Sequence, residues 1–73
     1  MSNDKTIGEI FDTLTGMQKE EIYMIIGNLL GGHISLNNAI RSFELRDDLN
    51  DDQKKVITII FKTAMNDYKW RDV

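Results

Sequence analysis

The chain has 73 residues, twelve acidic and nine basic side chains for a formal net charge of −3, and neither cysteine nor proline. This length allows one domain, and the lack of cysteine excludes a disulfide framework and a cysteine-bound zinc or iron–sulfur module. The acidic balance disfavours a strong nucleic-acid binder, because phosphate would be repelled. We expect a small soluble domain with a modest hydrophobic core.

Neither a targeting segment nor a membrane span is expected. Residues 1–5 are polar, and no apolar stretch of the signal-peptide type follows them. The longest uncharged stretch covers residues 22–40, but its apolar part ends at Leu30 and is too short to cross a bilayer. We therefore expect an intracellular protein.

Four positions carry a side-chain oxygen where a helix would begin. In three of them Glu or Gln follows three residues later, the capping-box spacing in which both side chains satisfy free backbone N–H groups. The three pairs are Thr6 with Glu9, Thr15 with Gln18, and Asn50 with Gln53, and Ser35 is a fourth cap without such a partner. The predicted helices cover residues 6–13, 16–30, 36–45 and 51–68.

Apolar residues follow each cap at helical spacing, and Gly31-Gly32 ends the second helix. Residues 22–26 and 56–61 are rich in β-branched and aromatic types, but their period, caps and length favour helix over strand. The sequence thus predicts an all-α domain, a small four-helix bundle or paired helical hairpins. The expected core residues are Ile10, Phe11, Leu14, Ile22, Ile25, Leu29, Ile40, Phe43, Ile57, Ile60, Phe61 and Ala64.

Two segments of the chain, 35 residues apart, match each other. The matching pairs are Leu14 and Leu49, Thr15 and Asn50, Gln18 and Gln53, Lys19 and Lys54, Ile22 and Ile57, Ile25 and Ile60, and Ile26 and Phe61. Two similar hairpins around a pseudo-twofold axis would produce this pattern. Two unrelated capped amphipathic helices of similar composition would also produce it, because short matches arise easily.

The charges are divided unevenly between the two halves. Residues 1–36 hold two lysines against five acidic side chains, whereas residues 37–73 hold seven of each sign. The first half is therefore unsuited to contact DNA, and the mixed charges of the second half are typical of solvated surface.

Catalytic residues are sparse. His33 is the single histidine and stands next to Gly31-Gly32. A nucleophile triad or a histidine-based metal site needs partners that the chain barely offers, so we interpret His33 as a turn residue. We expect no enzymatic activity, no cofactor and no metal.

The acidic run from Arg46 to Asp52 resembles the beginning of a calcium-binding loop, but the positions that follow do not fit one. Asp48, Asn50 and Asp52 have the first three spacings of an EF-hand loop. The sixth position is Gln53 in place of glycine and the twelfth is Ile59 in place of a bidentate glutamate. The carboxylates are better interpreted as an acidic start of the last helix, where they meet the positive end of its dipole.

The second and third predicted helices could also form a helix-turn-helix, with Asn37, Asn38 and Arg41 as base readers. The acidic first half and the lack of a flanking basic patch argue against this interpretation.

Gly27 and Gly31 have the spacing that lets two helices approach closely. A mid-helix glycine either marks such a crossing or is merely tolerated, and both interpretations stay open.

Near the C-terminus, Tyr68, Trp70 and Arg71 are residue types common in interface hot spots. The alternative is that Tyr68 and Trp70 cover the small core.

The segment from Glu9 to Gly27 resembles a stretch of tailed-phage head-assembly proteins, found in the scaffold-like C-terminal segments of prohead proteases and in scaffolding proteins. The matching positions are Phe11, Asp12, Leu14, Thr15, Gln18, Lys19, Tyr23, Ile26 and Gly27. Gly16-Met17 depart from the usual acidic or proline-like residues at that place. The resemblance implies a phage or prophage protein, and because no protease body accompanies the segment, it carries over no proteolytic activity.

The function expected from the resemblance is protein–protein interaction in phage head assembly, with a capsid-assembly protein as partner and with self-association. Tyr23, Ile26 and Leu30, with Trp70 nearby, are the predicted interaction residues. The alternative is a small phage-encoded inhibitor of a host factor, of the anti-defence or anti-CRISPR type; a DNA-binding repressor is a third reading. Each would act in the cytoplasm of an infected or lysogenic bacterium.

Overall fold

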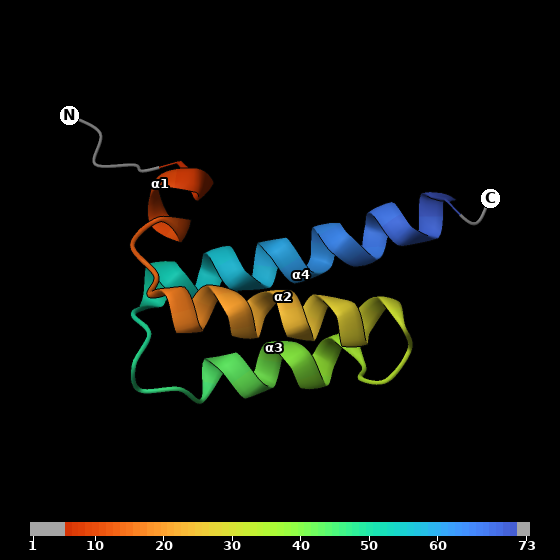
Figure 1. Cartoon of the computed structure of the whole chain (residues 1–73), viewed down its shortest axis with the longest axis horizontal. Coiled ribbons are helices and arrows are strands. Elements are labelled where there is room, and N and C mark those ends of the chain that lie inside the picture. Colours follow the sequence, from red (N-terminus) through yellow and green to blue (C-terminus); the bar gives the residue numbers. More distant parts are fainter. Residues whose placement is uncertain (1–5, 72–73) are drawn as a thin grey trace.

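Four helices make up the part of the chain that the computed structural model describes, which is residues 6–71, with side chains as far as Asp67. They are α1 (Ile7–Phe11), α2 (Gly16–Leu30), α3 (Leu36–Glu44) and α4 (Asp51–Arg71). The helices α2, α3 and α4 pack on one another, and α1 packs on α4 (Figure 1). The all-α prediction is confirmed.

The predicted caps form the starts of all four helices. In both threonine boxes the Thr side chain accepts from a backbone N–H three residues later, and the Glu9 or Gln18 side chain accepts in return from the threonine N–H. At the start of α4, Gln53 N–H donates to Asn50 Oδ1 at 2.8 Å, and Gln53 Oε1 accepts from Asn50 N–H at 2.9 Å. Ser35 caps α3 without a reciprocal partner. Local side-chain chemistry thus sets where each helix begins.

The end of α2 is a Schellman turn. The N–H groups of Gly32 and His33 donate to the carbonyls of Leu29 and Asn28 at 3.2 and 2.8 Å. Gly32 has φ of 78°, in the left-handed region that glycine enters without steric cost. The turn reverses the chain, so α3 runs antiparallel to α2 (Figure 1).

Two helix boundaries differ from the prediction by more than one residue. Helix α1 ends at Phe11 instead of residue 13, because the chain must reach the extended conformation of the Thr15 cap, at φ −72° and ψ 163°. Helix α4 continues to Arg71 instead of residue 68. Its sequence contains no glycine or proline that would end it earlier.

The core lies between α2, α3 and α4. Ile22, Ile57 and Phe61 have no exposed surface, and the rings of Phe43 and Phe61 pack edge to face with centroids 5.4 Å apart. The buried apolar residues that were not expected in the core are Ala39, Leu49 and Val56. Expected core residues that are only half-buried are Ile10, Phe11, Ile25, Ile40, Ile60 and Ala64.

The two matching segments occupy equivalent environments. Leu14 and Leu49 are 5% and 6% exposed, and Gln18 and Gln53 are 8% and 9% exposed. Gln18 Nε2 donates to the Asp48 carbonyl oxygen at 3.3 Å and to Asp48 Oδ2 at 3.0 Å. Gln53 Nε2 donates to Thr13 Oγ1 at 3.0 Å.

These bonds are reciprocal, because Thr13 and Asp48 are themselves 35 residues apart. The side-chain oxygen of each glutamine accepts from the N–H of the cap residue of its own helix. Its side-chain nitrogen donates to a residue that precedes the other helix. The helices α2 and α4 run in the same direction with their starts side by side (Figure 1). This arrangement favours the interpretation of two similar hairpins.

The interpretation of Gly27 as the site of a close helix crossing is wrong. Gly27 is exposed, and a Cβ atom added there would meet nothing within 4 Å. The space is open to solvent, so the residue is merely tolerated within α2.

Replacing a reciprocal glutamine should destabilise the fold. Gln18→Leu removes one half of a capping box and the bond to Asp48, so we expect the free energy of unfolding to fall by about 1–2 kcal/mol. Urea unfolding followed by circular dichroism measures the change. Asn28→Ala, an exposed change in the same helix, should shift stability by no more than about 0.5 kcal/mol. Equal effects of the two substitutions would show that the reciprocal bonds contribute nothing.

Two glycine substitutions should have opposite effects. Gly32→Ala forces a Cβ into the left-handed region and should cost about 1 kcal/mol of stability. Gly27→Ala adds a good helix former in open space and should increase stability by up to about 1 kcal/mol. Thermal unfolding of both variants beside the natural chain checks the signs, and destabilisation by Gly27→Ala would indicate a close contact that the structure lacks.

Candidate interaction surface

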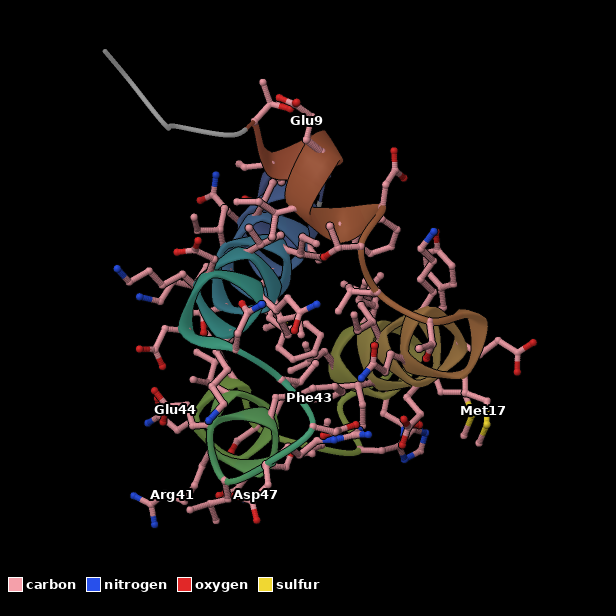
Figure 2. The ribbon with its side chains drawn as sticks, turned by 90° about the vertical axis from the view of Figure 1, so that its left-hand side faces the viewer. Glu9, Met17, Arg41, Phe43, Glu44 and Asp47 are labelled. Atoms are coloured by element: carbon pink, nitrogen blue, oxygen red, sulfur yellow. The ribbon has the colours of Figure 1, made fainter. Side chains whose placement is uncertain are left out.

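The outer face of α2 carries the largest exposed apolar side chains of that helix. Met17, Tyr23 and Met24 are 77%, 61% and 68% exposed. Helical spacing places them away from the side on which Ile22 and Leu29 are buried. Figure 2, a view along the bundle, shows Met17 pointing outward from α2. This face is therefore available for contact with another molecule.

The structure separates Tyr23 from Ile26 and Leu30. Tyr23 is exposed, whereas Ile26 is half-buried and packs on the core, and Leu30 is also half-buried. The Trp70 side chain lies outside the described residues. Sequence reasoning missed Met17 and Met24, which lie off the apolar stripe of α2; their i, i+7 spacing on the polar side was the available signal.

Aromatic contacts orient Tyr23. Its ring lies 6.2 Å from that of Phe11, centroid to centroid, at an interplanar angle of 56°. Lys19 Nζ lies 5.3 Å from the centre of the Phe11 ring. Phe11 therefore supports the Tyr23 ring from α1 and restricts its rotamers.

A hollow between α2 and α3 adjoins this face. It is lined by Glu21, Met24, Ile25, Ser42, Phe43 and Arg46. Arg46 Nη1 pairs with Glu21 Oε1 at 2.9 Å, and its guanidinium carbon lies 5.4 Å from the centre of the Phe43 ring. Arg46 thus lines the hollow and links the loop after α3 to α2.

Asp48 completes this network. Arg46 Nη2 and Nε donate to its two carboxylate oxygens at 2.7 and 2.9 Å, a bidentate pair. The hydrogen bonds from Arg46, and next those from Gln18, hold the pKa of Asp48 well below its usual range. The hydrogen bonds that Arg46 donates to Asp48, and next the one to Glu21, raise the pKa of Arg46. Both shifts favour the charged forms of the two side chains.

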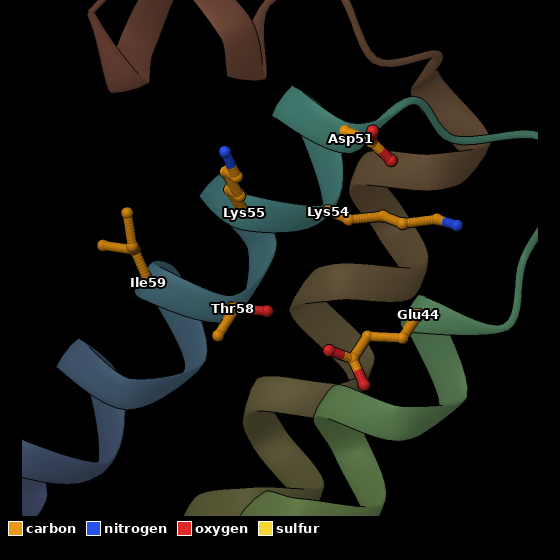
Figure 3. A pocket seen from close by; sticks show the side chains of 6 residues that line it. All are labelled: Glu44, Asp51, Lys54, Lys55, Thr58 and Ile59. Atoms are coloured by element: carbon orange, nitrogen blue, oxygen red, sulfur yellow. The ribbon is translucent and has the colours of Figure 1, made fainter.

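A second hollow lies between α3 and α4 (Figure 3). Its lining residues are Glu44, Asp51, Lys54, Lys55, Thr58 and Ile59. Ile59 is 44% exposed. Two lysines and two carboxylates surround an exposed isoleucine, an arrangement suited to a mixed polar and apolar contact.

The remaining candidates have structural surroundings. His33 is exposed in the turn after α2, as predicted. Asp48 and Asn50, two of the proposed calcium ligands, are engaged with Arg46 and with the start of α4. Within residues 6–71, no three His, Asp or Glu side chains gather in a way that could hold a metal ion. Arg41 projects from the α3 end of the bundle together with Glu44 and Asp47, whose charges would oppose phosphate (Figure 2).

Comparisons with protein-family models, with curated proteins and with solved structures find no match to this chain. Among the described helices, none is long and apolar enough to cross a membrane.

Stability should depend on the charge of Asp48. Because the folded-state pKa of this carboxyl is lowered, its contribution is present above about pH 4, the ordinary range of an aspartate, and is lost as the pH falls below that. We expect the urea midpoint of the natural chain to fall more steeply between pH 5 and pH 2.5 than that of Asp48→Asn.

Asp47→Asn is the matched control, because Asp47 is exposed and adjacent in sequence. It should keep the steep dependence of the natural chain. Parallel pH profiles for the natural chain and Asp48→Asn would contradict the assigned role of the Arg46 pair.

Proposed function

We propose that the chain acts without catalysis, by protein–protein interaction, as a scaffold-like factor of phage head assembly that associates with itself. The observation that carries the proposal is the position of the exposed apolar side chains. Met17, Tyr23 and Met24 all lie within residues 9–27, the segment that resembles head-assembly proteins. The resemblance and the exposed surface thus coincide.

The matching residues of that segment fall into two groups. Leu14 and Gln18 are buried, and Ile26 packs on the core, so these positions maintain the hairpin. Tyr23 is matched and exposed. A segment that builds a hairpin and presents one supported tyrosine is suited to present a binding face to another protein.

Side-chain chemistry supports a protein as the partner. Tyrosine and methionine are enriched at interfaces, where tyrosine supplies large contact area and methionine adapts to irregular surfaces. Glu20 and Glu21 accompany them on α2, and the first half of the chain is acidic. The face therefore suits a basic or mixed protein surface better than nucleic acid. A phage assembly partner would place the chain in the cytoplasm of an infected or lysogenic bacterium.

Removal of the exposed side chains should weaken binding while leaving the fold intact. We expect the double variant Tyr23→Ser, Met24→Ser to weaken self-association by roughly tenfold or more, since buried tyrosines are typical hot spots. Sedimentation velocity over a concentration series measures self-association. Co-purification with the major capsid protein of the same phage or prophage genome measures the assembly contact.

Leu45→Ser is the control, because Leu45 is 77% exposed but follows α3 instead of lying on α2. It should keep both activities. A natural chain that is monomeric at high concentration and does not bind the capsid protein would contradict the proposal. Specific capture of a bacterial defence protein instead would favour the alternative of a host-factor inhibitor.

A further inference from the structure

The outer faces of α2 and α4 lie on opposite sides of the bundle. In Figure 2, α4 (teal to blue) is on the left and α2 (orange to olive) is on the right, with Met17 pointing away from the centre. The reciprocal bonds of Gln18 and Gln53 make the two helices equivalent across the 35-residue offset. Each outward position of α2 therefore has a counterpart on α4.

One exposed pair of counterparts is opposite in charge and another is apolar in both helices, whereas Tyr23 corresponds to the half-buried Thr58. Glu20 of α2 corresponds to Lys55 of α4, and Met24 corresponds to Ile59. Gly27, which adds no side chain, corresponds to Lys62 of α4. We call Glu20, Tyr23, Met24 and Gly27 the α2 stripe, and Lys55, Ile59 and Lys62 the α4 stripe.

Both stripes are accessible, and their charges form no ion pair with another described side chain. Met24 and Ile59 are 68% and 44% exposed, and all the other members of the two stripes are exposed. The ion pairs between described side chains join Lys19 to Asp12 and Arg46 to Glu21 and Asp48, so Glu20, Lys55 and Lys62 take no part in them. These three charges are available to a partner.

Charge complementarity indicates which pairs of faces can meet. Two α4 stripes would bring lysines together in either relative direction, and two parallel α2 stripes would bring Glu20 of one copy toward Glu20 of the other, and these contacts are repulsive. Two antiparallel α2 stripes would place each Glu20 opposite Gly27, without a basic partner. An α2 stripe against an α4 stripe brings Glu20 toward lysines and Met24 toward Ile59. Gly27 leaves open space at this contact, because a Cβ atom there would meet nothing within 4 Å.

We propose that the partner of the α2 stripe is the α4 stripe of a second copy of this chain, so that copies join head to tail. This inference rests on the proposed self-association and assigns its two faces. Because the stripes lie on opposite sides of the bundle, each copy keeps one free face after binding, and the contact continues into an open chain or a ring. The Ile59 side of the hollow in Figure 3 would receive the Met24 side chain.

The contact involves one helix face from each copy, which places it in the small and transient size class. Association should therefore rise with protein concentration and weaken with added salt, because the charged pairs are at the surface. At high concentration the mean mass should exceed that of a dimer.

Charge reversal on each stripe tests the pairing. Variant A carries Glu20→Lys, and variant B carries Lys55→Glu and Lys62→Glu, all at exposed positions. Sedimentation velocity is run on the natural chain, on each variant alone, on an equimolar mixture of A and B, and on Arg41→Glu, an exposed charge reversal on α3 that should associate normally. Circular dichroism verifies that each variant is folded.

We expect A alone and B alone to associate roughly tenfold more weakly than the natural chain. The mixture should recover association, because the intact α2 stripe of B meets the intact α4 stripe of A. Unchanged association of A alone would instead show that the α2 stripe takes no part. Unchanged association of B would show that α4 takes no part.

Either of these last two results overturns the head-to-tail pairing while leaving self-association in place. A natural chain that stays monomeric overturns both the pairing and the proposed self-association, so the two failures are distinguishable.

Discussion

The structure depends on how the N-termini of α2 and α4 are capped at one end of the bundle. The two helices begin there side by side and run in the same direction, so their free N–H groups point the same way (Figure 1). Two like-oriented helix starts repel each other through their dipoles and must satisfy buried backbone donors. Gln18 and Gln53 meet the second requirement, since each accepts from the N–H of its own cap residue and donates to the residue that leads into the other helix. The carboxylate of Asp48 adds negative charge at the same place.

This constraint determines which faces are left for partners. With the glutamines buried, Ile22 and Ile57 point inward, and the opposite side of each helix points to solvent. The outward residues then differ between the halves, because α2 carries Glu20 and Met24 where α4 carries Lys55 and Ile59. Two similar frameworks thus present two complementary surfaces, which is the physical basis for proposing contact between copies.

Much of the fold could be predicted because its signals are local. A cap and its partner three residues later require no knowledge of the rest of the chain, and every predicted cap is present. Burial was harder to predict, because it depends on neighbours distant in sequence. From sequence, a capping glutamine is expected at the surface, because nothing local shows that a second hairpin covers it. Leu49 lies outside any apolar stripe, and only its match to Leu14 indicated that it could be buried. Helical spacing likewise placed Tyr23 and Ile26 on one side of α2 without showing that the core covers Ile26.

The most direct test of the central claim is the neighbourhood of the Met24 methyl group in the associated protein. Isotope-filtered nuclear Overhauser spectroscopy on a mixture of two copies, one with labelled methionine methyls and the other unlabelled, reports only contacts between copies. A cross-peak from Met24 to the methyl groups of Ile59 is the result expected from the complementary faces. A cross-peak between Met24 and Tyr23 of the other copy, with none to Ile59, would contradict it.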